Sequence, residues 1–352
     1  MENVLFHSRE GEVNNAIIIV VVIYIVGSYL IKILGLGPSG TALALSLGKE
    51  VGVVDIHPRY YKACGEAVPV DTPMVSKKYV LNKIRRFIFY LEDKAIGEVS
   101  YASPKWYIVD KSSWISSMRE RIKSSEDTSW EIVVDARGPY TSRGVKVNVV
   151  RAYVRDYRRN IDSETVYFIY EKGMAGFYWV FPYGEDLNIG GGFMGVRNPV
   201  PFIHRFLNLW LEGGSIVDLR GAPLTVEPEI DLGSHKIFRV GEAAGLVYPL
   251  TGEGIRPGIE SAIALASALS SRRPLENYAK AVSKIIKQIE TQKKILRIAV
   301  KIIEGGGSIS QLIDDSILRD YIEENISGRT LLTMISKRPG KAISIIAKIL
   351  RL

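Results

Sequence analysis

Short apolar runs that end in glycine or in an acid recur along the chain and predict buried strands. The first run, Ile31–Leu34, leads into Gly35, and the second, at 51–54, ends at Asp55. Between them, residues 41–49 carry leucines and alanines at a density typical of a helix. This order of strand, glycine turn, helix and strand predicts a parallel sheet covered by helices. A further run at 130–134 ends in an acid and a glycine turn and is well placed to join that sheet.

The turn after the first run carries Gly35, Gly37 and Gly40 in the spacing G-x-G-x-x-G, with Ser39 inside it. Gly35 allows the tight turn, Gly37 lets backbone N–H groups approach a pyrophosphate, and Gly40 lets the helix pack on the strand. The helix N-terminus faces the phosphates in such motifs, and Asp55 is placed to accept a ribose hydroxyl. The pattern therefore indicates a dinucleotide site, for NAD or FAD, rather than a turn without a ligand.

The pattern changes after residue 147. Alternating or apolar segments at 149–154, 165–170, 177–181 and 187–193 are separated by Gly and Asp turns, which is typical of an antiparallel sheet. After Pro274 the periodicity is helical nearly to the end of the chain. We therefore expect a mixed α/β fold. Its parts are an apolar extension at 1–28, a Rossmann-like nucleotide-binding domain at 29–146 and 236–273, an inserted antiparallel substrate domain at 147–235, and a helical region at 274–352.

A second glycine-rich motif lies late in the chain. A strand at 236–240 delivers Gly241 and Glu242, and Thr251-Gly-Glu-Gly254 then opens a helix with bare backbone N–H groups. A helix N-terminus of this kind suits a developing anion, such as a reduced flavin ring or a second phosphate. The alternative is a loop followed by a core helix.

The composition argues against a disulfide-bonded, a metal-binding and a nucleic-acid-binding protein. Apolar residues make up 47% and charged residues 24%, which are ordinary globular values. Cys64 is the single cysteine, so an intrachain disulfide is impossible, and the four histidines show no metal-ligand spacing. No basic block is interleaved with aromatic residues, so nucleic acid is not the expected partner of this chain, whose net charge is +8.

The apolar run at 16–26 is shorter than the roughly 20 residues that a spanning helix needs. Extending it forward would take residues 29–34, which the glycine turn needs as its strand. Three interpretations stay open: a short membrane anchor, an extra element packed on the domain, or residues upstream of the true start.

Several motifs together resemble those of FAD-dependent proteins with the aromatic-hydroxylase fold. They are Gly35-Leu-Gly-Pro-Ser-Gly40, Cys64-Gly-Glu66, Val134-Asp-Ala-Arg-Gly138 and the segment from Gly241 to Ile255. Within that fold, Phe177-Tyr-Trp-Val-Phe-Pro182, a spacer of seven and Gly190-Gly-Gly192 are similar to the Y-x-W-x-F-P and G-x-G signature of the geranylgeranyl reductase family. The resemblance covers about residues 29–350.

The resemblance implies FAD bound in an extended form and an apolar tunnel for a prenyl chain. The implied cofactor-binding residues are Gly35, Gly37, Ser39, Gly40, Asp55, Cys64, Gly65, Lys111, Asp135, Gly241, Glu242, Gly252, Gly254 and Ile255. The implied substrate-binding residues are Phe177, Trp179, Phe181, Pro182, Gly190, Gly192 and Pro249. Of these, Cys64, Trp179 and Phe177 are the candidate catalytic residues.

Four features depart from the family pattern or admit a second interpretation. Cys64 is either an active-site thiol or a small buried apolar residue. Phe177 replaces the family's tyrosine, so a phenolic hydroxyl is lost, and Lys111 replaces an arginine that relatives carry before the helix. About eight residues separate the predicted helix at 112–123 from the strand at 131–135, where relatives have a strand and a three-stranded meander near the adenine.

The late helices combine apolar and basic faces. Lysines at 280–301 fall largely opposite an apolar stripe, and a final segment at 337–351 shows a similar pattern. Basic amphipathic helices suit anionic membrane surfaces, and packing on the core with a solvated basic face is the alternative. We expect a cytoplasmic protein in peripheral contact with the membrane, through these helices or the N-terminal apolar segment, with a redox partner as a further possibility.

These observations predict an FAD-dependent reductase that saturates C=C bonds in prenyl chains, in the synthesis of isoprenoid ether lipids. An FAD monooxygenase on an apolar substrate is the enzyme alternative. The non-enzyme alternative is a diverged prenyl-lipid-binding relative without catalytic activity. The electron donor, NAD(P)H or ferredoxin, does not follow from the sequence, because its one dinucleotide motif is assigned to FAD.

Overall fold

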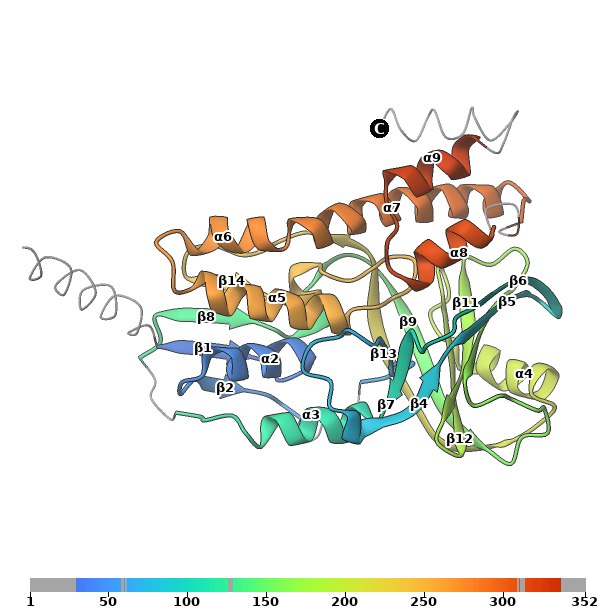
Figure 1. The fold of residues 1–352 in the computed structure, drawn as a ribbon, viewed down its shortest axis with the longest axis horizontal. Helices are drawn as coiled ribbons and strands as arrows, with labels where there is room; N and C mark the ends of the chain where they lie inside the picture. The colour runs from blue at the N-terminus through green and yellow to red at the C-terminus, as the bar shows by residue number, and fades with distance from the viewer. Residues whose placement is uncertain are drawn as a thin grey trace, which may run out of the picture.

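The computed structural model describes residues 30–57, 60, 62–125, 129–308, 310 and 314–336 (Figure 1). The expectations for residues 1–28 and for the basic segment at 337–351 lie outside the described residues. The mixed α/β fold expected from the sequence is confirmed, with a parallel sheet, a larger and mostly antiparallel sheet, and a small antiparallel one.

A four-stranded parallel sheet forms the first half of the molecule. Its strands, in spatial order, are β14 (Ile237–Arg239), β8 (Ile132–Asp135), β1 (Ile31–Leu34) and β2 (Gly52–Val54). Helices α2 (Pro38–Leu47), α3 (Lys111–Arg119) and α5 (Ile255–Ala268) accompany it in the left half of Figure 1. The core of this half contains Ile33, Val134 and Phe238 from three strands and Leu43 and Ile259 from two helices. Strands from three separate parts of the chain, at 31–54, 132–135 and 237–239, therefore build one nucleotide-type sheet.

The helix α3 begins at Lys111, one residue before the predicted range of 112–123. Ser112 is a residue of the helix, and Asp110 is the N-cap, whose carboxylate accepts the backbone N–H of Ser113 at 3.0 Å. An aspartate cap satisfies a free N–H of the first turn, so the helix starts at the residue that follows Asp110.

A seven-stranded sheet forms the second half. Its strands, in spatial order, are β13 (Ser215–Glu229), β9 (Arg143–Arg155), β12 (Asp186–Phe193), β11 (Gly176–Tyr183), β10 (Thr165–Tyr170), β5 (Arg86–Leu91) and β6 (Lys94–Ser100). All neighbours pair antiparallel except β10 and β5. Strands β5 and β6 lie within the range 29–146 that the sequence assigns to the nucleotide-binding domain, yet they pair with the larger sheet.

A three-stranded sheet, β3 (Ala67–Pro69), β7 (Trp106–Val109) and β4 (Val80–Ile84), lies between the two halves. Short 3-10 turns occur at η1 (Lys77–Tyr79), η2 (Gly138–Tyr140) and η3 (Gly241–Ala244).

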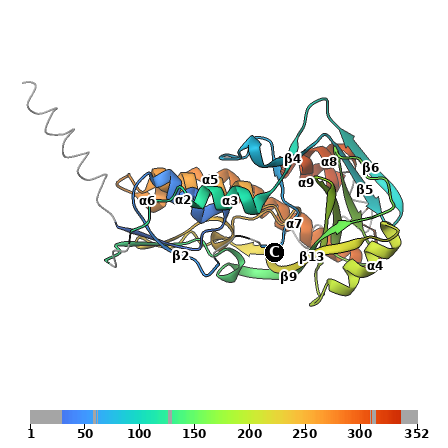
Figure 2. The ribbon, with the colours of Figure 1, turned by 90° about the horizontal axis from the view of Figure 1, so that it is seen from below.

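Helices cover both faces of the seven-stranded sheet. Figure 2 shows α4 (Val200–Trp210) on one side and α8 (Asp315–Ile322) on the other. Helices α6 (Pro274–Ala281) and α7 (Ser283–Glu304) run above both sheets in Figure 1, and α9 (Gly328–Ser336) packs on α7 and α8. Each sheet face is thus buried under a different set of side chains.

The apolar stripe of α7 faces the protein interior. Ile289 packs into the core of the first half, and Ile295, Ile298 and Ile302 pack into the core beneath the seven-stranded sheet. Among the described residues, no helix is long and apolar enough to cross a bilayer. Of the two interpretations of this helix, the structure supports core packing with a solvated basic face.

Gly40 is the residue that lets α2 approach β1. A Cβ added there would lie 1.9 Å from the carbonyl oxygen of Gly35. We expect Gly40→Ala to lower the free energy of unfolding by about 1–3 kcal/mol, because an extra methyl in a packed interior forces the backbone apart. Gly328→Ala, where a Cβ meets nothing within 4 Å, is the matched control and should leave the melting temperature unchanged or slightly raised. Equal melting temperatures for the two variants would contradict this account.

Candidate functional site

A cavity of about 900 Å³ connects the two halves of the molecule. It begins at the glycine turn after β1, passes the N-terminus of α5, and ends between the seven-stranded sheet and helices α7 and α8. This volume lies at the upper end of the range for small-molecule sites, roughly 300–1,000 Å³.

The glycine turn has the geometry that a dinucleotide needs. Gly35 has a φ of 92°, and a Cβ there would lie 2.8 Å from the carbonyl oxygen of Ala136. Gly37 is the N-cap of α2, and together with Leu36 and Ser39 it lies on the cavity wall. The N-terminal end of α2, which carries the positive end of the helix dipole, is therefore open to an anion in the cavity.

Asp55 also lies on the wall, and its carboxylate is partly occupied. It accepts the N–H groups of Leu36 at 2.8 Å and His57 at 2.9 Å, and it pairs with Arg119 at 2.8 Å. A carboxylate offers about four acceptor positions, so room remains for one ribose hydroxyl. Arg119 also donates to the carbonyl oxygens of Leu36 and His57, which fixes the turn and the acid together.

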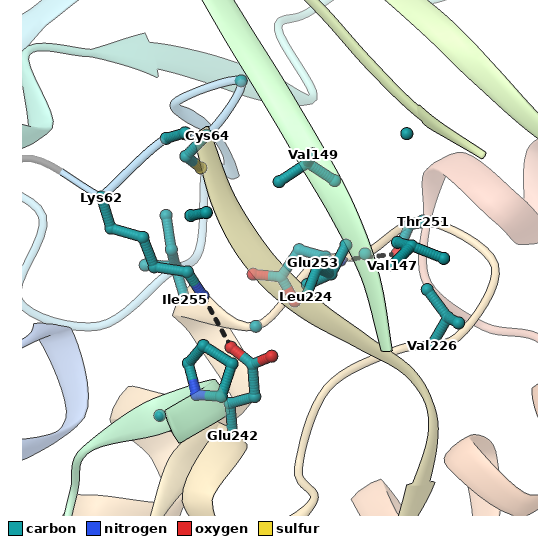
Figure 3. Close-up of a pocket in the computed structure, with 18 of the residues that line it drawn as sticks. Lys62, Cys64, Val147, Val149, Leu224, Val226, Glu242, Thr251, Glu253 and Ile255 are labelled. Carbon is teal, nitrogen blue, oxygen red and sulfur yellow. Dashed lines mark hydrogen bonds and ion pairs between the residues drawn. The ribbon is translucent and has the colours of Figure 1, made fainter. Parts of the chain in front are cut away.

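The loop after β2 places a lysine across the middle of the cavity. Lys62 Nζ lies 2.7 Å from Glu242 Oε2, and a dashed line marks this ion pair in Figure 3. Burial alone would lower the pKa of Lys62, but Glu242 and Tyr60 raise it, so the ammonium group stays charged. Glu242 is held in turn by the backbone N–H of Thr225 at 2.8 Å, and Lys111 is buried and donates to the carbonyl oxygen of Lys62 at 2.9 Å.

Cys64 lies on the cavity wall in a loop fixed to the seven-stranded sheet. Its Sγ accepts the backbone N–H of Glu66 at 3.3 Å, and its carbonyl oxygen accepts Asn188 Nδ2 at 3.0 Å. A Cβ at Gly65 would lie 2.7 Å from the ring of Phe181, so only glycine fits there. The loop thus approaches the sheet closely and presents the thiol group at the cavity.

Hydrogen bonds continue from that loop into the sheet. The Glu66 carboxylate accepts the hydroxyl of Tyr153 and the amide of Asn188, and Trp179 Nε1 donates to Asn188 Oδ1 at 2.9 Å. Burial raises the pKa of Glu66, while Lys111 lowers it. This network orients Trp179 and satisfies the polar groups beneath an otherwise apolar wall.

The far end of the cavity is apolar and aromatic. From the sheet it is lined by Phe168, Tyr170, Phe177, Trp179, Phe181, Gly192, Val147, Val149, Ala222, Leu224 and Val226. From the helices it is lined by Ile295, Leu296, Ala299, Ile303, Ile317, Leu318 and Tyr321. Phe168 lies at the centre of the aromatic group, with its ring centroid 5.5 Å from that of Phe181 and 5.7 Å from that of Phe177. Such a space suits a hydrocarbon chain.

Most residues singled out from the sequence meet at this cavity. Those on its wall are Gly35, Gly37, Ser39, Asp55, Cys64, Gly65, Lys111, Phe177, Trp179, Phe181, Gly192, Glu242, Pro249, Gly252, Gly254 and Ile255.

Five residues lie behind the wall. Gly40 and Gly241 are packing positions, and a Cβ at Gly241 would lie 2.1 Å from Ser39 Oγ. Gly190 leaves room for the Trp179 ring, since a Cβ there would lie 2.1 Å from it. Pro182 is buried in β11.

Asp135 is the fifth residue behind the wall. Its carboxylate is held by Arg137 and Thr141, with contacts of 3.0 Å to each side chain. It therefore stabilises the turn after β8.

Sequence reasoning did not single out Tyr60, Lys62, Arg119, Tyr170, Glu253 and Tyr321, which also line the cavity. Glu253 stands inside the Thr251–Gly254 motif, so its position was visible in the sequence. Lys62 and Arg119 gain their roles from partners 180 and 64 residues away, which no local pattern reveals.

Comparison with known proteins gives a consistent result. The chain is 28% identical over 123 residues to a digeranylgeranylglycerophospholipid reductase of Methanocaldococcus jannaschii, covering 32% of this chain and 30% of that protein. It is 26% identical over 187 residues to the protein of the same name from Methanococcus vannielii, covering 47% and 45%. The resemblance is confirmed. The chain matches less than half the length of these relatives, and no protein-family model matches it.

Solved structures show the same fold. A geranylgeranyl bacteriochlorophyll reductase-like protein of Thermoplasma acidophilum superposes with a TM-score of 0.66 at 17% identity, covering 91% of this chain and 99% of that chain. The myxobacterial FAD-dependent halogenase CndH superposes with a TM-score of 0.61 at 13% identity, covering 84% and 89%. At these identities the likeness shows the fold.

The residues present fit an extended FAD. The glycine turn and the N-terminus of α2 suit the pyrophosphate, and Asp55 keeps an acceptor for the ribose. The N-terminus of α5, with Gly254 as its N-cap, lies on the same wall further along, where an anionic ring would be stabilised. Between α3 and β8, the strand-like pairing among the described residues is an isolated bridge between Val51 and Ser124. The part of the site that would face the adenine is therefore built by a short segment.

Proposed function

We propose that this protein is an FAD-dependent reductase that saturates C=C bonds of prenyl chains in isoprenoid lipids. The single observation that carries the proposal is the continuity of the cavity, which joins a dinucleotide turn to a long apolar space lined by aromatic rings. The sequence similarity to digeranylgeranylglycerophospholipid reductases supports this choice of substrate.

In this proposal, the chain holds and orients both reactants. Gly35, Gly37 and Ser39 hold the pyrophosphate, Asp55 the ribose, and the turn at 251–255 the ring system. FAD, when bound and reduced, supplies a hydride to the alkene. The apolar wall around Phe177 and Trp179 excludes water and aligns the prenyl chain, which lowers the entropic cost of reaching the reactive geometry.

The electron donor stays open between NAD(P)H and ferredoxin. We also propose that the protein meets its lipid at the cytoplasmic face of the membrane, because the proposed substrate is a lipid and most lysines of α7 are exposed. Sedimentation with anionic vesicles, compared with neutral vesicles, tests this contact, and equal recovery from both would contradict an electrostatic one.

An oxygen-dependent reaction on an apolar substrate is the second candidate, favoured by the halogenase fold of several structural neighbours. It differs from the reductase in needing O₂ after the flavin is reduced. Anaerobic single turnover separates the two, since only a reductase saturates the alkene without oxygen.

The decisive experiment begins with the absorption spectrum of the purified protein. We expect flavin bands, or their appearance on adding FAD, and a tight complex by quenching of flavin fluorescence. The reduced protein, mixed without oxygen with a geranylgeranyl lipid, should oxidise its flavin and yield product with fewer double bonds by mass spectrometry. A colourless protein that takes up no FAD would contradict both enzyme functions and leave a prenyl-lipid-binding protein.

A further inference from the structure

Four charged side chains from three distant segments meet behind the turn that begins α5. Arg256 donates through Nη2 to the carboxylate of Glu324, and its Nη1 lies 3.3 Å from Asp71 Oδ2. Its backbone N–H donates to Glu253 Oε1 at 2.7 Å. One arginine therefore holds two glutamates at the cavity turn and an aspartate at the surface.

The buried part of this cluster has more acid than base. Glu324 is 3% exposed, whereas the Asp71 side chain is 70% exposed. Glu253 Oε2 and Glu324 Oε1 are buried and have no hydrogen-bond partner among the described residues. Ionising both buried carboxyl groups beside one guanidinium would be energetically unfavourable, because their like charges repel. The pair therefore retains a proton.

The electrostatics of the surrounding groups agree with this. Burial raises the pKa of Glu253 well above its ordinary value, and the charges of Glu324 and Glu260 raise it further, whereas Arg256 lowers it. Burial raises the pKa of Glu324 to about 7, against the lowering effect of Arg256. Tyr248 faces the same carboxylates, and its burial together with their charges raises the pKa of its phenol. At neutral pH the cluster is therefore partly protonated.

Glu253 is the member of the cluster that reaches the cavity. It lies on the wall between Thr251 and Gly254, and Figure 3 shows it beside Val147 and Leu224, where the polar and apolar ends of the cavity meet.

The other described carboxyl groups on the cavity wall already have hydrogen-bond or ion-pair partners. Asp55 is bound by Arg119, Glu242 by Lys62 and Thr225, and Glu66 by Tyr153 and Asn188.

Resting on the proposed function, we propose that Glu253 donates the proton that alkene saturation consumes. Glu324 is a positioning residue that keeps Glu253 protonated, and Arg256 holds the two carboxyl groups in place. Saturating one C=C bond takes a hydride and a proton. The hydride comes from the reduced flavin, and two electrons come with it. The O–H bond of Glu253 breaks as a C–H bond forms on the second alkene carbon, which leaves a carboxylate. Solvent reloads that carboxylate from the side of Asp71, where the cluster is exposed.

The test compares Glu253→Gln with wild type and with Glu290→Gln, a matched change at an exposed residue of α7 paired with Lys293. The first readout is infrared absorption of the full-length protein. Wild type should show the carbonyl band of a protonated carboxylic acid, shifted in D₂O. That band should weaken in Glu253→Gln and persist in Glu290→Gln.

The second readout is the rate of anaerobic single turnover with a geranylgeranyl lipid. Glu253→Gln should bind FAD as wild type does and react about 10²–10⁴-fold more slowly, the usual contribution of a positioned general acid. A rate within about threefold of wild type would overturn the proposal. Glu290→Gln should react at the wild-type rate.

The third readout is the pH profile of that rate. The rate should fall as pH rises past the pKa of Glu253, because only the protonated acid can donate. Glu324→Gln removes a charge that raises this pKa, so the falling limb should move to lower pH. If the falling limb of the pH profile stays in place in Glu324→Gln, the positioning role of Glu324 is overturned. The same measurement tests the proposal if Glu253→Gln fails to fold. If wild type binds FAD but reduces no prenyl lipid, the proposed function fails, and the infrared band alone decides whether Glu253 holds the proton.

Discussion

Gly37→Ala is expected to give a folded protein that purifies without flavin. The residue has φ −68° and ψ −171°, which alanine adopts without strain, and a Cβ there would lie 3.4 Å from the ring of Tyr60, an ordinary contact. The added methyl would nevertheless stand where backbone N–H groups meet a pyrophosphate. Losing two hydrogen bonds to a charged group costs about 3–6 kcal/mol, so the affinity for FAD should fall on the order of 100-fold or more.

Fluorescence quenching measures this affinity, and thermal unfolding without added FAD measures stability. The Gly328→Ala control should bind FAD as wild type does. If Gly37→Ala keeps its flavin, the cofactor enters the cavity by another route and the glycine turn is structural. If both variants unfold at lower temperature than wild type, the comparison moves to Ser39→Val, which alters the same wall at the second residue of α2.

Ala299→Phe is expected to abolish activity on long prenyl chains while leaving flavin in place. Ala299 lies on α7, 7% exposed, on the wall of the apolar end of the cavity. A phenyl group there would shorten the space that a C₂₀ chain occupies, and each methylene that loses its burial costs about 0.8 kcal/mol. Four displaced methylenes correspond to roughly a 200-fold fall in kcat/KM. A C₁₀ chain should lose much less.

The ratio of kcat/KM values for the two chain lengths is the quantity to measure. Lys301→Phe places the same group on the exposed face of α7 and should leave the ratio unchanged. An equal loss for both chain lengths, with a lowered melting temperature, would show that overpacking disturbs the fold. If Ala299→Phe acts on the C₂₀ and C₁₀ chains as wild type does, the prenyl group does not bind beside Ala299.

The nucleotide half of the fold could be predicted because its constraints are local. Gly35 and Gly40 stand where a tight turn and a close backbone contact exclude a side chain. The same holds for Gly241, which has a φ of 58°. At these positions the spacing of glycines in the sequence and the backbone geometry both require a residue without a side chain. Gly37 stands where a pyrophosphate would approach the backbone, and the acid follows on the next strand.

The larger sheet was harder to predict because its neighbours are remote in sequence. The strand β13 contains Gly221, Pro223 and Pro228, which read as loop signals. It lies at the edge of the sheet and pairs only with β9, so the missing N–H groups of its prolines remove no bond from a second neighbour. Strand β5 pairs with β10, about 80 residues away, and no pattern within β5 indicates which sheet it joins.

The charged groups of the site show the same limit. Nothing near Lys62 in the sequence indicates Glu242, and nothing near Arg256 indicates Asp71 or Glu324. Such pairs depend on the packing of whole elements. The motif around Glu253 could be recognised from spacing, but its excess of negative charge could not.

The order in which the chain is synthesised gives the discontinuous fold a further consequence. The nucleotide sheet gains its last strand at Arg239 and the helix α5 at Ala268. The apolar face of the seven-stranded sheet gains its cover only when α7 and α8 have left the ribosome. A nascent chain therefore completes its nucleotide-type half while the seven-stranded sheet still exposes aromatic rings. We expect this interval to be the stage at which chaperones or a membrane surface are most needed during biogenesis.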